Sequence, residues 1–214
     1  MWQSNKDYFE HSAPTLSEEW QHARLGRITG HSMLTVPTDI DKFLTKTTYD
    51  RNAFGIAEES EALQQYIYKK RLTRYRQPGF IIPNPHSDKY SWVPPHLKKA
   101  LCHIGGTPDV VVGGLSLVAE LKCKQPNSKH ITHIYPSHYT QLMVNTGLMG
   151  YTQGDYFVVQ PDQSIYMRRF QLDPTWYQNT LIPILEFAND HLRPAVARET
   201  FELPLEIAEW YWSE

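Results

Sequence analysis

A β-hairpin is the strongest local prediction for this chain of 214 residues. Residues 109–112 and 115–122 are rich in valine and leucine, and such residues favour strands. Gly113 and Gly114 separate the two runs, and a glycine pair between apolar runs is typical of a two-residue hairpin turn. The sequence therefore predicts two antiparallel strands whose side chains have a fixed relation to each other.

The predicted hairpin brings two acidic side chains and a lysine to one face. With a two-residue turn, Asp109 lies opposite Val118. Side chains alternate between faces along a strand, so Glu120 and Lys122 share the face of Asp109. Glu120 is then the diagonal neighbour of Asp109, at about 7–8 Å between backbones. A proline–aspartate pair followed by a Glu-x-Lys triplet is the core of a two-carboxylate metal nuclease site.

Two carboxylates at this separation are suited to a hard divalent cation. Mg²⁺ commonly binds one or two carboxylates together with phosphate oxygens and water. Asp109 and Glu120 fit that description, and we expect the backbone carbonyl of Leu121 to be a third ligand. A metal here would activate a water molecule and orient a scissile phosphate. Lys122 would hold the attacking water and stabilise charge in the transition state.

Each of these side chains also has an ordinary interpretation. Asp109 can be a turn aspartate after a proline, Glu120 an exposed strand residue, and Lys122 its surface partner. Either motif alone occurs by chance in many chains. Their occurrence together on one face of a predicted hairpin favours the metal site.

The overall charge gives little support to a nucleic-acid enzyme. The net charge is -2 and the pI is near 6.5, whereas DNA-binding proteins are often basic. Local basic groups matter more than the sum, and residues 199–214 form an acidic tail that offsets them. Candidates for a basic groove are Lys69, Lys70, Arg71, Arg74, Arg76, Lys98, Lys99, Arg168 and Arg169. Their alternative role is that of solvated helix faces.

Metal sites built on sulfur or histidine are disfavoured. Cys102 and Cys123 are the only cysteines, too few for the four that an iron–sulfur cluster requires. His130, His133 and His138 invite a zinc site, but no cysteine or carboxylate completes the set at suitable spacing. We favour ordinary loop histidines.

The same composition predicts where the protein acts. Two cysteines form no disulfide framework, which favours a reducing environment. No run approaches 18 apolar residues, so no membrane span is predicted. The first residues lack the apolar core of a signal peptide. We expect an intracellular protein, in the cytoplasm or at a site of DNA replication.

The order of the remaining elements predicts an α/β domain. We expect one domain over residues 1–214, with a core at about 17–192 and an acidic tail at about 193–214. Residues 1–14 are expected to be partly irregular. Helices are predicted at 17–26, 51–74, 137–147 and 173–191, and further strands at 155–160 and 164–171. This order predicts a mixed central sheet flanked by helices.

Four separated segments of the chain resemble one nuclease family. Residues 20–30 are similar to its W…R-x-G-x-I-T-x-S opening, and 55–66 to its G-x3-E-x2-A helix. Residues 107–123 hold the hairpin motif, and 139–147 resemble its Y-x2-Q helix, with a shifted tyrosine. The chain thus resembles the phage lambda exonuclease or YqaJ-type viral recombinase (alkaline exonuclease) family. That family lies within the PD-(D/E)xK superfamily, whose fold is restriction-endonuclease-like.

The resemblance implies a specific activity and further site residues. It implies Mg²⁺-dependent 5′→3′ digestion of linear double-stranded DNA, with Mn²⁺ as a substitute. It implies that Arg24 contacts the 5′-terminal phosphate, that Glu59 approaches a second metal or its water, and that Gln141 helps to hold the nucleophile or Lys122. A ring-shaped homotrimer around DNA and cooperation with a single-strand annealing protein in recombination are also implied.

The phosphate pocket departs from the family pattern at one position. The family's phosphate-binding serine should fall at position 31, where this chain has His31, followed by Ser32. Ser32, Thr29 or a protonated His31 are the candidates to replace it. The departure leaves the predicted metal site untouched.

Two other functions are compatible with the same residues. One is a PD-(D/E)xK endonuclease that recognises a structure or a site. The other is a non-catalytic protein that binds DNA ends. The joint presence of Asp109, Glu120 and Lys122 argues against the second, because a dead site has no need of all three.

Overall fold

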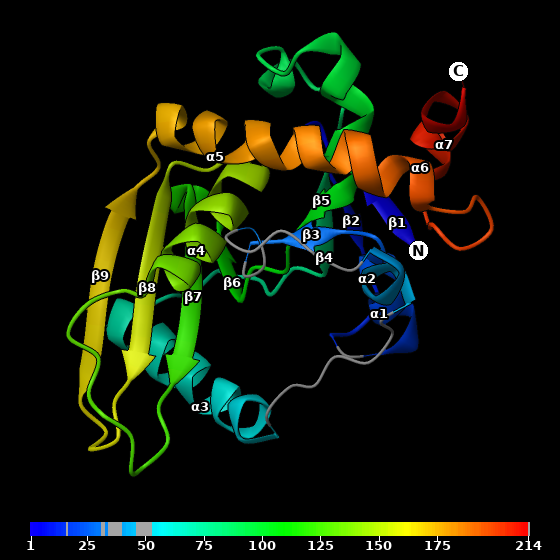
Figure 1. The fold of residues 1–214 in the computed structure, drawn as a ribbon. Coiled ribbons are helices and arrows are strands. Elements are labelled where there is room, and N and C mark those ends of the chain that lie inside the picture. The colour runs from blue at the N-terminus through cyan, green and yellow to red at the C-terminus, as the bar shows by residue number, and fades with distance from the viewer. Residues whose placement is uncertain (16, 31–32, 34–39, 46–52, 214) are drawn as a thin grey trace.

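The computed structural model describes residues 1–15, 17–30, 33, 40–45 and 53–213. A mixed four-stranded sheet lies on one side of the molecule, with β9 at the outer edge (Figure 1). Its strands lie in the order β6 (Val110–Val112), β7 (Leu117–Cys123), β8 (Gln153–Val159) and β9 (Ile165–Gln171). β7 and β8 are parallel, and the other neighbours are antiparallel. The predicted α/β architecture with a mixed sheet is confirmed.

Helices cover both faces of this sheet. On one face, α3 (Ala53–Lys70) packs through Ala62 and Tyr66 against alternate residues of β7 and β8. On the other face, α4 (Pro136–Leu148) packs through Leu142 and the residues beside it, and α5 (Pro174–Phe187) packs on α4. The alternation of side chains along β7 therefore sorts them between an α3 side and an α4 side.

A second sheet uses the N-terminal residues, which we expected to be partly irregular. β1 (Trp2–Ser4), β2 (Tyr8–His11) and β4 (Phe80–Pro83) form an antiparallel sheet. Phe9 and Phe80 are buried there, so apolar burial stabilises a segment that is polar on average. Residues 1, 5–7 and 12–14 lie outside these strands, so the segment is partly irregular, as predicted.

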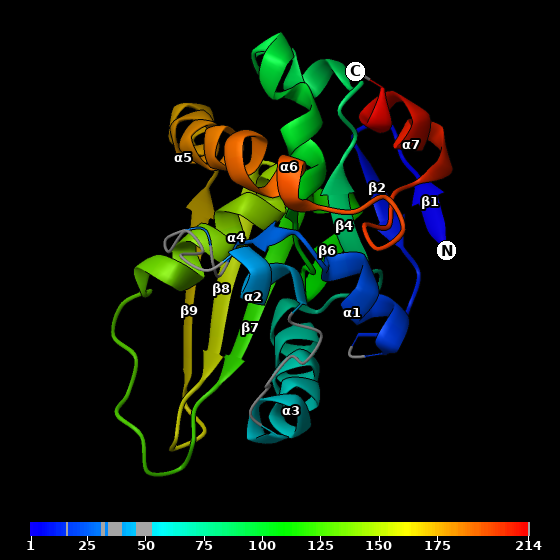
Figure 2. The same ribbon diagram turned by 45° about the vertical axis from the view of Figure 1, so that its right-hand side comes forward.

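The C-terminal segment packs against the second sheet. α7 (Leu205–Trp212) lies beside β1 (Figure 2). It buries Ile207 and Tyr211 in one cluster with Trp20 and Phe80. The acidic tail thus ends in a helix that is part of the core. Arg27 connects the 3-10 turn at Pro95–His103 to the segment before α7 by donating hydrogen bonds to the carbonyls of Cys102 and Glu202.

Short elements connect these layers. They are α1 (Glu18–Arg24), β3 (Ile28–Thr29), α2 (Ile40–Thr45), the 3-10 turns at Asp88–Tyr90, Pro95–His103 and Gly113–Leu115, β5 (Ile104–Gly105), a π-helical turn at Ala188–Leu192, and α6 (Arg193–Ala195). β3 and β5 pair in parallel. Among the described residues, no helix has both the length and the apolar character that a bilayer crossing requires.

Helix ends follow local chemistry. Ser17 and Asp173 cap α1 and α5, each accepting a hydrogen bond from a backbone N–H of the first turn. α4 has Tyr135 as its N-cap, without a side-chain hydrogen bond, and Pro136 at the first helical position.

Candidate active site

The hairpin that carries the nuclease motif has a longer turn than predicted. A type I′ turn needs positive φ at both central residues, and neither Gly113 nor Gly114 has it. The positive φ of 50° falls at Ser116, after a 3-10 turn, and Val112 pairs with Leu117. The two-residue turn was therefore wrong. The register moves by two residues, which preserves the face of every side chain.

The register change brings the two acids closer than the predicted diagonal. Val110 pairs with Ala119, so one further step sets Asp109 across from Glu120. Asp109 Oδ2 accepts a hydrogen bond of 2.7 Å from the backbone N–H of Leu121. Asp109 is 7% exposed and Glu120 fully buried. The structure thus brings both carboxylates together at the end of β6 and the middle of β7.

The charge state of Glu120 reflects this crowding. Burial, together with the nearby charges of Asp109 and Glu59, raises the pKa of Glu120 to about 8 against the opposing effect of Lys122. Two neighbouring carboxylates in a dry site disfavour each other's ionisation. A cation between them would reverse that preference.

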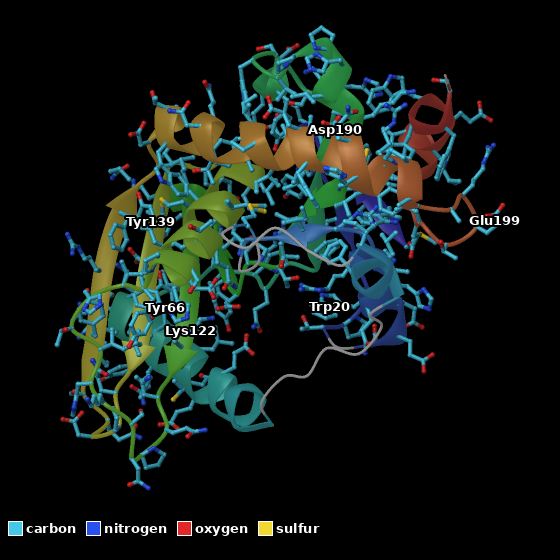
Figure 3. The ribbon with its side chains drawn as sticks, viewed as in Figure 1. Trp20, Tyr66, Lys122, Tyr139, Asp190 and Glu199 are labelled. Atoms are coloured by element: carbon cyan, nitrogen blue, oxygen red, sulfur yellow. The ribbon has the colours of Figure 1, made fainter. Side chains whose placement is uncertain are left out.

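Lys122 supplies part of that positive charge. Its Nζ donates to Glu120 Oε1 in an ion pair, and its side chain is 28% exposed. Figure 3 shows Lys122 on the four-stranded sheet. Burial alone would lower the pKa of Lys122, but Glu120 and Asp109 raise it above its ordinary value. The amine is therefore an ammonium at neutral pH, able to donate hydrogen bonds to solvent or substrate.

One oxygen of Glu120 fits a metal ligand. Within the part of the chain that the structure describes, Glu120 Oε2 is buried and has no hydrogen-bond partner. Such an atom is costly unless something coordinates it. The described residues hold no cluster of three or more His, Cys, Asp or Glu side chains suited to a metal. The donor set instead matches Mg²⁺ bound by two carboxylates, with water or phosphate in the remaining positions.

Two helices contribute the other predicted catalytic residues. Glu59 on α3 acts electrostatically on both Glu120 and Lys122, so its charge lies near the same site. Gln141 lies on α4, where its Cα closely approaches Gly30. A Cβ on Gly30 would lie only 2.6 Å from that Cα, so this contact requires glycine. The chain after β3 therefore packs directly on α4.

The predicted phosphate-binding residues are only partly described. Arg24 lies in the last turn of α1, with its guanidinium carbon 4.3 Å from the Trp20 ring centre and 5.5 Å from that of Phe80. Thr29 lies in β3, beside Gly105. His31 and Ser32 lie outside the described residues. In both ribbon views, α1 and β9 lie on opposite sides of β7 (Figures 1 and 2).

Several basic residues proposed for a DNA groove have structural partners instead. Lys70 and Arg169 pair with Asp155, and Arg76 pairs with Glu10. Lys98 and Lys99 donate to backbone carbonyls. For these five residues, the interpretation as a DNA groove is weakened.

Sequence reasoning missed Tyr156, a buried neighbour of the motif. Tyr156 pairs in register with Glu120 across β7 and β8, and a 2.7 Å hydrogen bond joins its hydroxyl to His138 Nδ1. No local sequence signal reveals this neighbour, because the register of two parallel strands depends on how α4 crosses between them. Among the three histidines considered for zinc, His130 pairs with Asp162, whereas the rings of His133 and His138 both contact Tyr135.

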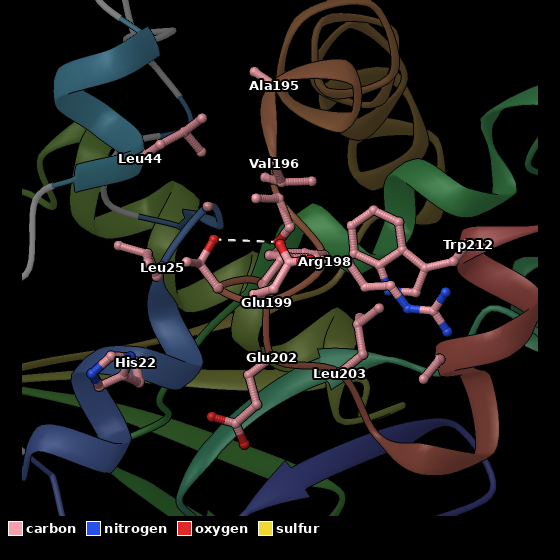
Figure 4. Close-up of a pocket in the computed structure, with 15 residues that line it drawn as sticks. His22, Leu25, Leu44, Ala195, Val196, Arg198, Glu199, Glu202, Leu203 and Trp212 are labelled. Carbon is pink, nitrogen blue, oxygen red and sulfur yellow. Dashed lines mark hydrogen bonds between the residues drawn. The ribbon is translucent and has the colours of Figure 1, made fainter.

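A large cavity lies apart from the carboxylates. Its volume is about 810 Å³, and it lies between α1, α2 and the segment leading to α7 (Figure 4). Its lining is largely apolar and includes Leu25, Leu44, Val196, Phe201 and Trp212. Neither carboxylate of the hairpin lines it, so the motif and the cavity are separate features.

Comparison with solved structures identifies exonucleases of the same fold. The chain is similar to the alkaline exonuclease LHK-Exo from Laribacter hongkongensis, with a TM-score of 0.61 and 18% identity over 83% of this chain and 93% of that chain. LHK-Exo in complex with dAMP gives a TM-score of 0.59 and 19% identity, over 83% and 95%. A phage-related exonuclease from Haemophilus somnus 129PT gives 0.51 and 13%, over 78% and 93%.

These similarities concern the fold, because the identities are low. They confirm, at that level, the resemblance inferred from the four sequence segments. No protein-family model matches the chain, and no curated protein matches its sequence.

Proposed function

We propose that this protein, which shares the fold of those exonucleases, is a Mg²⁺-dependent PD-(D/E)xK nuclease that digests linear double-stranded DNA from 5′ ends. The observation that carries the proposal is the hairpin itself. Asp109 and Glu120 meet on one side of the sheet, Lys122 adjoins them, and one buried oxygen of Glu120 is without a hydrogen-bond partner among the described residues.

The residues divide the chemistry between them. Asp109 and Glu120 would hold the metal, with the Leu121 carbonyl as a further ligand. When bound, Mg²⁺ or Mn²⁺ supplies charge neutralisation for the scissile phosphate and a water of lowered pKa. Lys122 donates a hydrogen bond that orients the attacking water and stabilises the negative charge that develops on the phosphate.

Other residues would support the attack. Glu59 adds a third carboxylate whose charge acts on the same site. Gln141, carried by α4, would hold the nucleophilic water or the ammonium of Lys122. Both assignments rest on the resemblance and on the placement of α3 and α4.

The direction of digestion would be set by the 5′ phosphate. Arg24 is the proposed contact, together with Thr29 and with His31 or Ser32. Stacking on Trp20 restrains the Arg24 guanidinium, and a restrained guanidinium suits bidentate phosphate binding. A homotrimeric ring would keep the enzyme on DNA, and a single-strand annealing protein would receive the strand that digestion exposes.

The decisive assay compares two DNA substrates. Purified protein with Mg²⁺ is incubated with 5′-phosphorylated linear duplex and with a closed circle of the same sequence. We expect loss of the linear duplex only, abolished in Asp109→Ala and Lys122→Ala but retained in Lys129→Ala, a control at an exposed loop position.

Other outcomes of this assay identify the competing functions. Cutting of the circle at a similar rate would indicate an endonuclease. Binding of DNA ends without cleavage of either substrate, at any Mg²⁺ or Mn²⁺ concentration, would indicate a non-catalytic end-binding protein. Arg24→Ala should reduce digestion of phosphorylated ends more than that of hydroxyl ends, and equal loss on both would remove its phosphate role.

A further inference from the structure

A tyrosine from the neighbouring strand borders the carboxylate site. Tyr156 on β8 is the Cα partner of Glu120 on β7, and the two strands run parallel. Residues paired in register project to the same side of a sheet, so Tyr156 and Glu120 both lie on the side that faces α4. Tyr156 is fully buried, as Glu120 is. The Tyr156 ring therefore lies in a fixed position beside Glu120.

A histidine of α4 holds this tyrosine. His138 lies in the first turn of α4, three residues before Gln141, and its Nδ1 is 2.7 Å from the Tyr156 hydroxyl. The ring of Tyr135 packs edge-on against His138 at 5.5 Å, and the His138 ring lies 5.6 Å from that of Tyr156. Ring contacts thus connect Tyr135 at the end of the loop, His138 at the start of α4 and Tyr156 on β8.

The hydroxyl of Tyr156 lies within electrostatic reach of the motif. Burial raises the pKa of Tyr156 above its ordinary value, Lys122 opposes that rise, and Glu120 adds to it. Both members of the ion pair therefore act on the same phenol. A buried phenol needs a hydrogen-bond partner, and His138 supplies it from outside the carboxylate cluster.

We propose that Tyr156 and His138 are a positioning pair that holds Glu120 and Lys122 in the arrangement needed for phosphodiester cleavage. Lysine has a long flexible side chain, and Lys122 is partly exposed. A neighbouring group is therefore needed to restrict Lys122 to the position in which it pairs with Glu120. The Tyr156 ring restricts the Lys122 side chain in this way, and the hydrogen bond to His138 holds the ring in place. The proposal rests on the nuclease function proposed above.

The first test removes one hydroxyl. Tyr156→Phe should lower kcat on linear duplex by about 10–100-fold, as the loss of partners behind metal ligands commonly does, with KM for DNA ends unchanged. Tyr166→Phe is the control, because Tyr166 contacts the Tyr156 ring at 6.2 Å from the adjacent strand. We expect kcat of Tyr166→Phe within about 2-fold of wild type, far below the range expected for a lost partner.

The second test varies the atom that contacts the hydroxyl. Asparagine places a polar atom where histidine has Nδ1, whereas glutamine extends it to the position of Nε2. His138→Asn should retain most of kcat, while His138→Gln and His138→Ala should lose about 10-fold or more. Urea unfolding of each variant separates this effect from loss of folding, and the histidine series decides the outcome if Tyr156→Phe is unfolded.

The possible outcomes separate the two proposals. A wild-type protein without nuclease activity overturns the proposed function, and the positioning role with it. An active wild type whose Tyr156→Phe and His138→Ala variants match it in kcat overturns the positioning pair alone. Equal losses in the asparagine and glutamine variants would also contradict the pair, because they would show that Nδ1 has no special role.

Discussion

Two buried carboxylates on adjacent strands have opposite surroundings. Asp155 on β8 faces α3 and is fully buried, yet it accepts hydrogen bonds from Arg169 at 2.6 and 2.9 Å and from the Tyr66 hydroxyl at 2.9 Å, and it pairs with Lys70 at 3.0 Å. Glu120 on β7 faces α4, with Lys122 on one oxygen and two acids nearby. Its other oxygen has no hydrogen-bond partner in the described chain.

The pKa values follow the surroundings. Although burial alone would raise it, hydrogen bonds from Arg169, Lys70 and Tyr66 lower the pKa of Asp155 overall. Burial and the charge of Asp109 raise that of Glu120. A buried carboxylate whose oxygens all accept hydrogen bonds typically has a structural role. A buried carboxylate with an oxygen that has no hydrogen-bond partner is typical of a ligand-binding site. The same sheet thus carries a structural acid on one face and a candidate catalytic acid on the other.

The largest expected effect is on activity. Glu120→Gln should lower kcat on linear duplex by on the order of 10²–10³, because it removes a metal ligand and a charge that positions Lys122. Asp155→Asn should leave kcat per folded molecule unchanged. Steady-state digestion with the folded fraction measured by circular dichroism checks both, and similar kcat losses in the two variants would abolish the contrast.

Stability should respond in the opposite order. Asp155→Asn removes a buried charge whose partners Lys70 and Arg169 are 20% and 40% exposed, so we expect the free energy of unfolding to fall by about 2 kcal/mol. Glu120→Gln should leave the metal-free protein as stable as wild type at pH 7.5, or more stable. Urea denaturation monitored by tryptophan fluorescence measures both. Equal destabilisation would show that Glu120 is also a structural acid.

The pH dependence of stability should separate the two acids. Between pH of about 4.5 and about 8, folded Glu120 holds a proton that the unfolded chain has released, so stability falls as pH rises through that window. Asp155 has the reverse sign, since its pKa lies below the ordinary 3.8 and its contribution is lost as pH falls through that region.

Unfolding midpoints of the metal-free protein from pH 3 to pH 9 test these signs. The decline between pH 5 and pH 8 should be absent in Glu120→Gln, and Mg²⁺ should suppress it in wild type, because the metal binds the ionised carboxylate. If the unfolding midpoint of the wild-type protein rises between pH 5 and pH 8, that result would contradict the raised pKa of Glu120.

The smallest effect concerns the tyrosines beside the two acids. Tyr66→Phe removes one of several donors to Asp155, so we expect a loss of about 1 kcal/mol in the free energy of unfolding and unchanged kcat. Tyr156→Phe should do the opposite and lower kcat with little loss of stability. Chemical denaturation and digestion assays on both variants would sharpen the difference between the two faces, or remove it if they behave alike.

Sequence patterns predicted the face of each motif residue better than the turn. Side-chain alternation depends only on parity, and the register moved by two residues, so Asp109, Glu120 and Lys122 kept a common face. The turn itself was wrong because the left-handed residue is Ser116 rather than a glycine. Local glycine chemistry could not reveal which of four residues would adopt that conformation.

Contacts between segments that are far apart in the chain could not be predicted from the sequence. The pairing of β2 with β4 joins residues about seventy positions apart, and the burial of Phe9 and Phe80 gives a polar segment its structure. The approach of Gly30 to Gln141 and the pairing of Tyr156 with Glu120 likewise depend on tertiary packing. Helix caps such as Ser17 and Asp173 were predictable because their chemistry is local.

Binding of Mn²⁺, measured by electron paramagnetic resonance, is the most direct test of whether Asp109 and Glu120 form one cation site. We predict a site in wild-type protein that Mg²⁺ displaces, that is lost in Glu120→Gln and Asp109→Asn, and that persists in folded Asp155→Asn. Wild-type affinity for Mn²⁺ in folded Glu120→Gln would contradict the account.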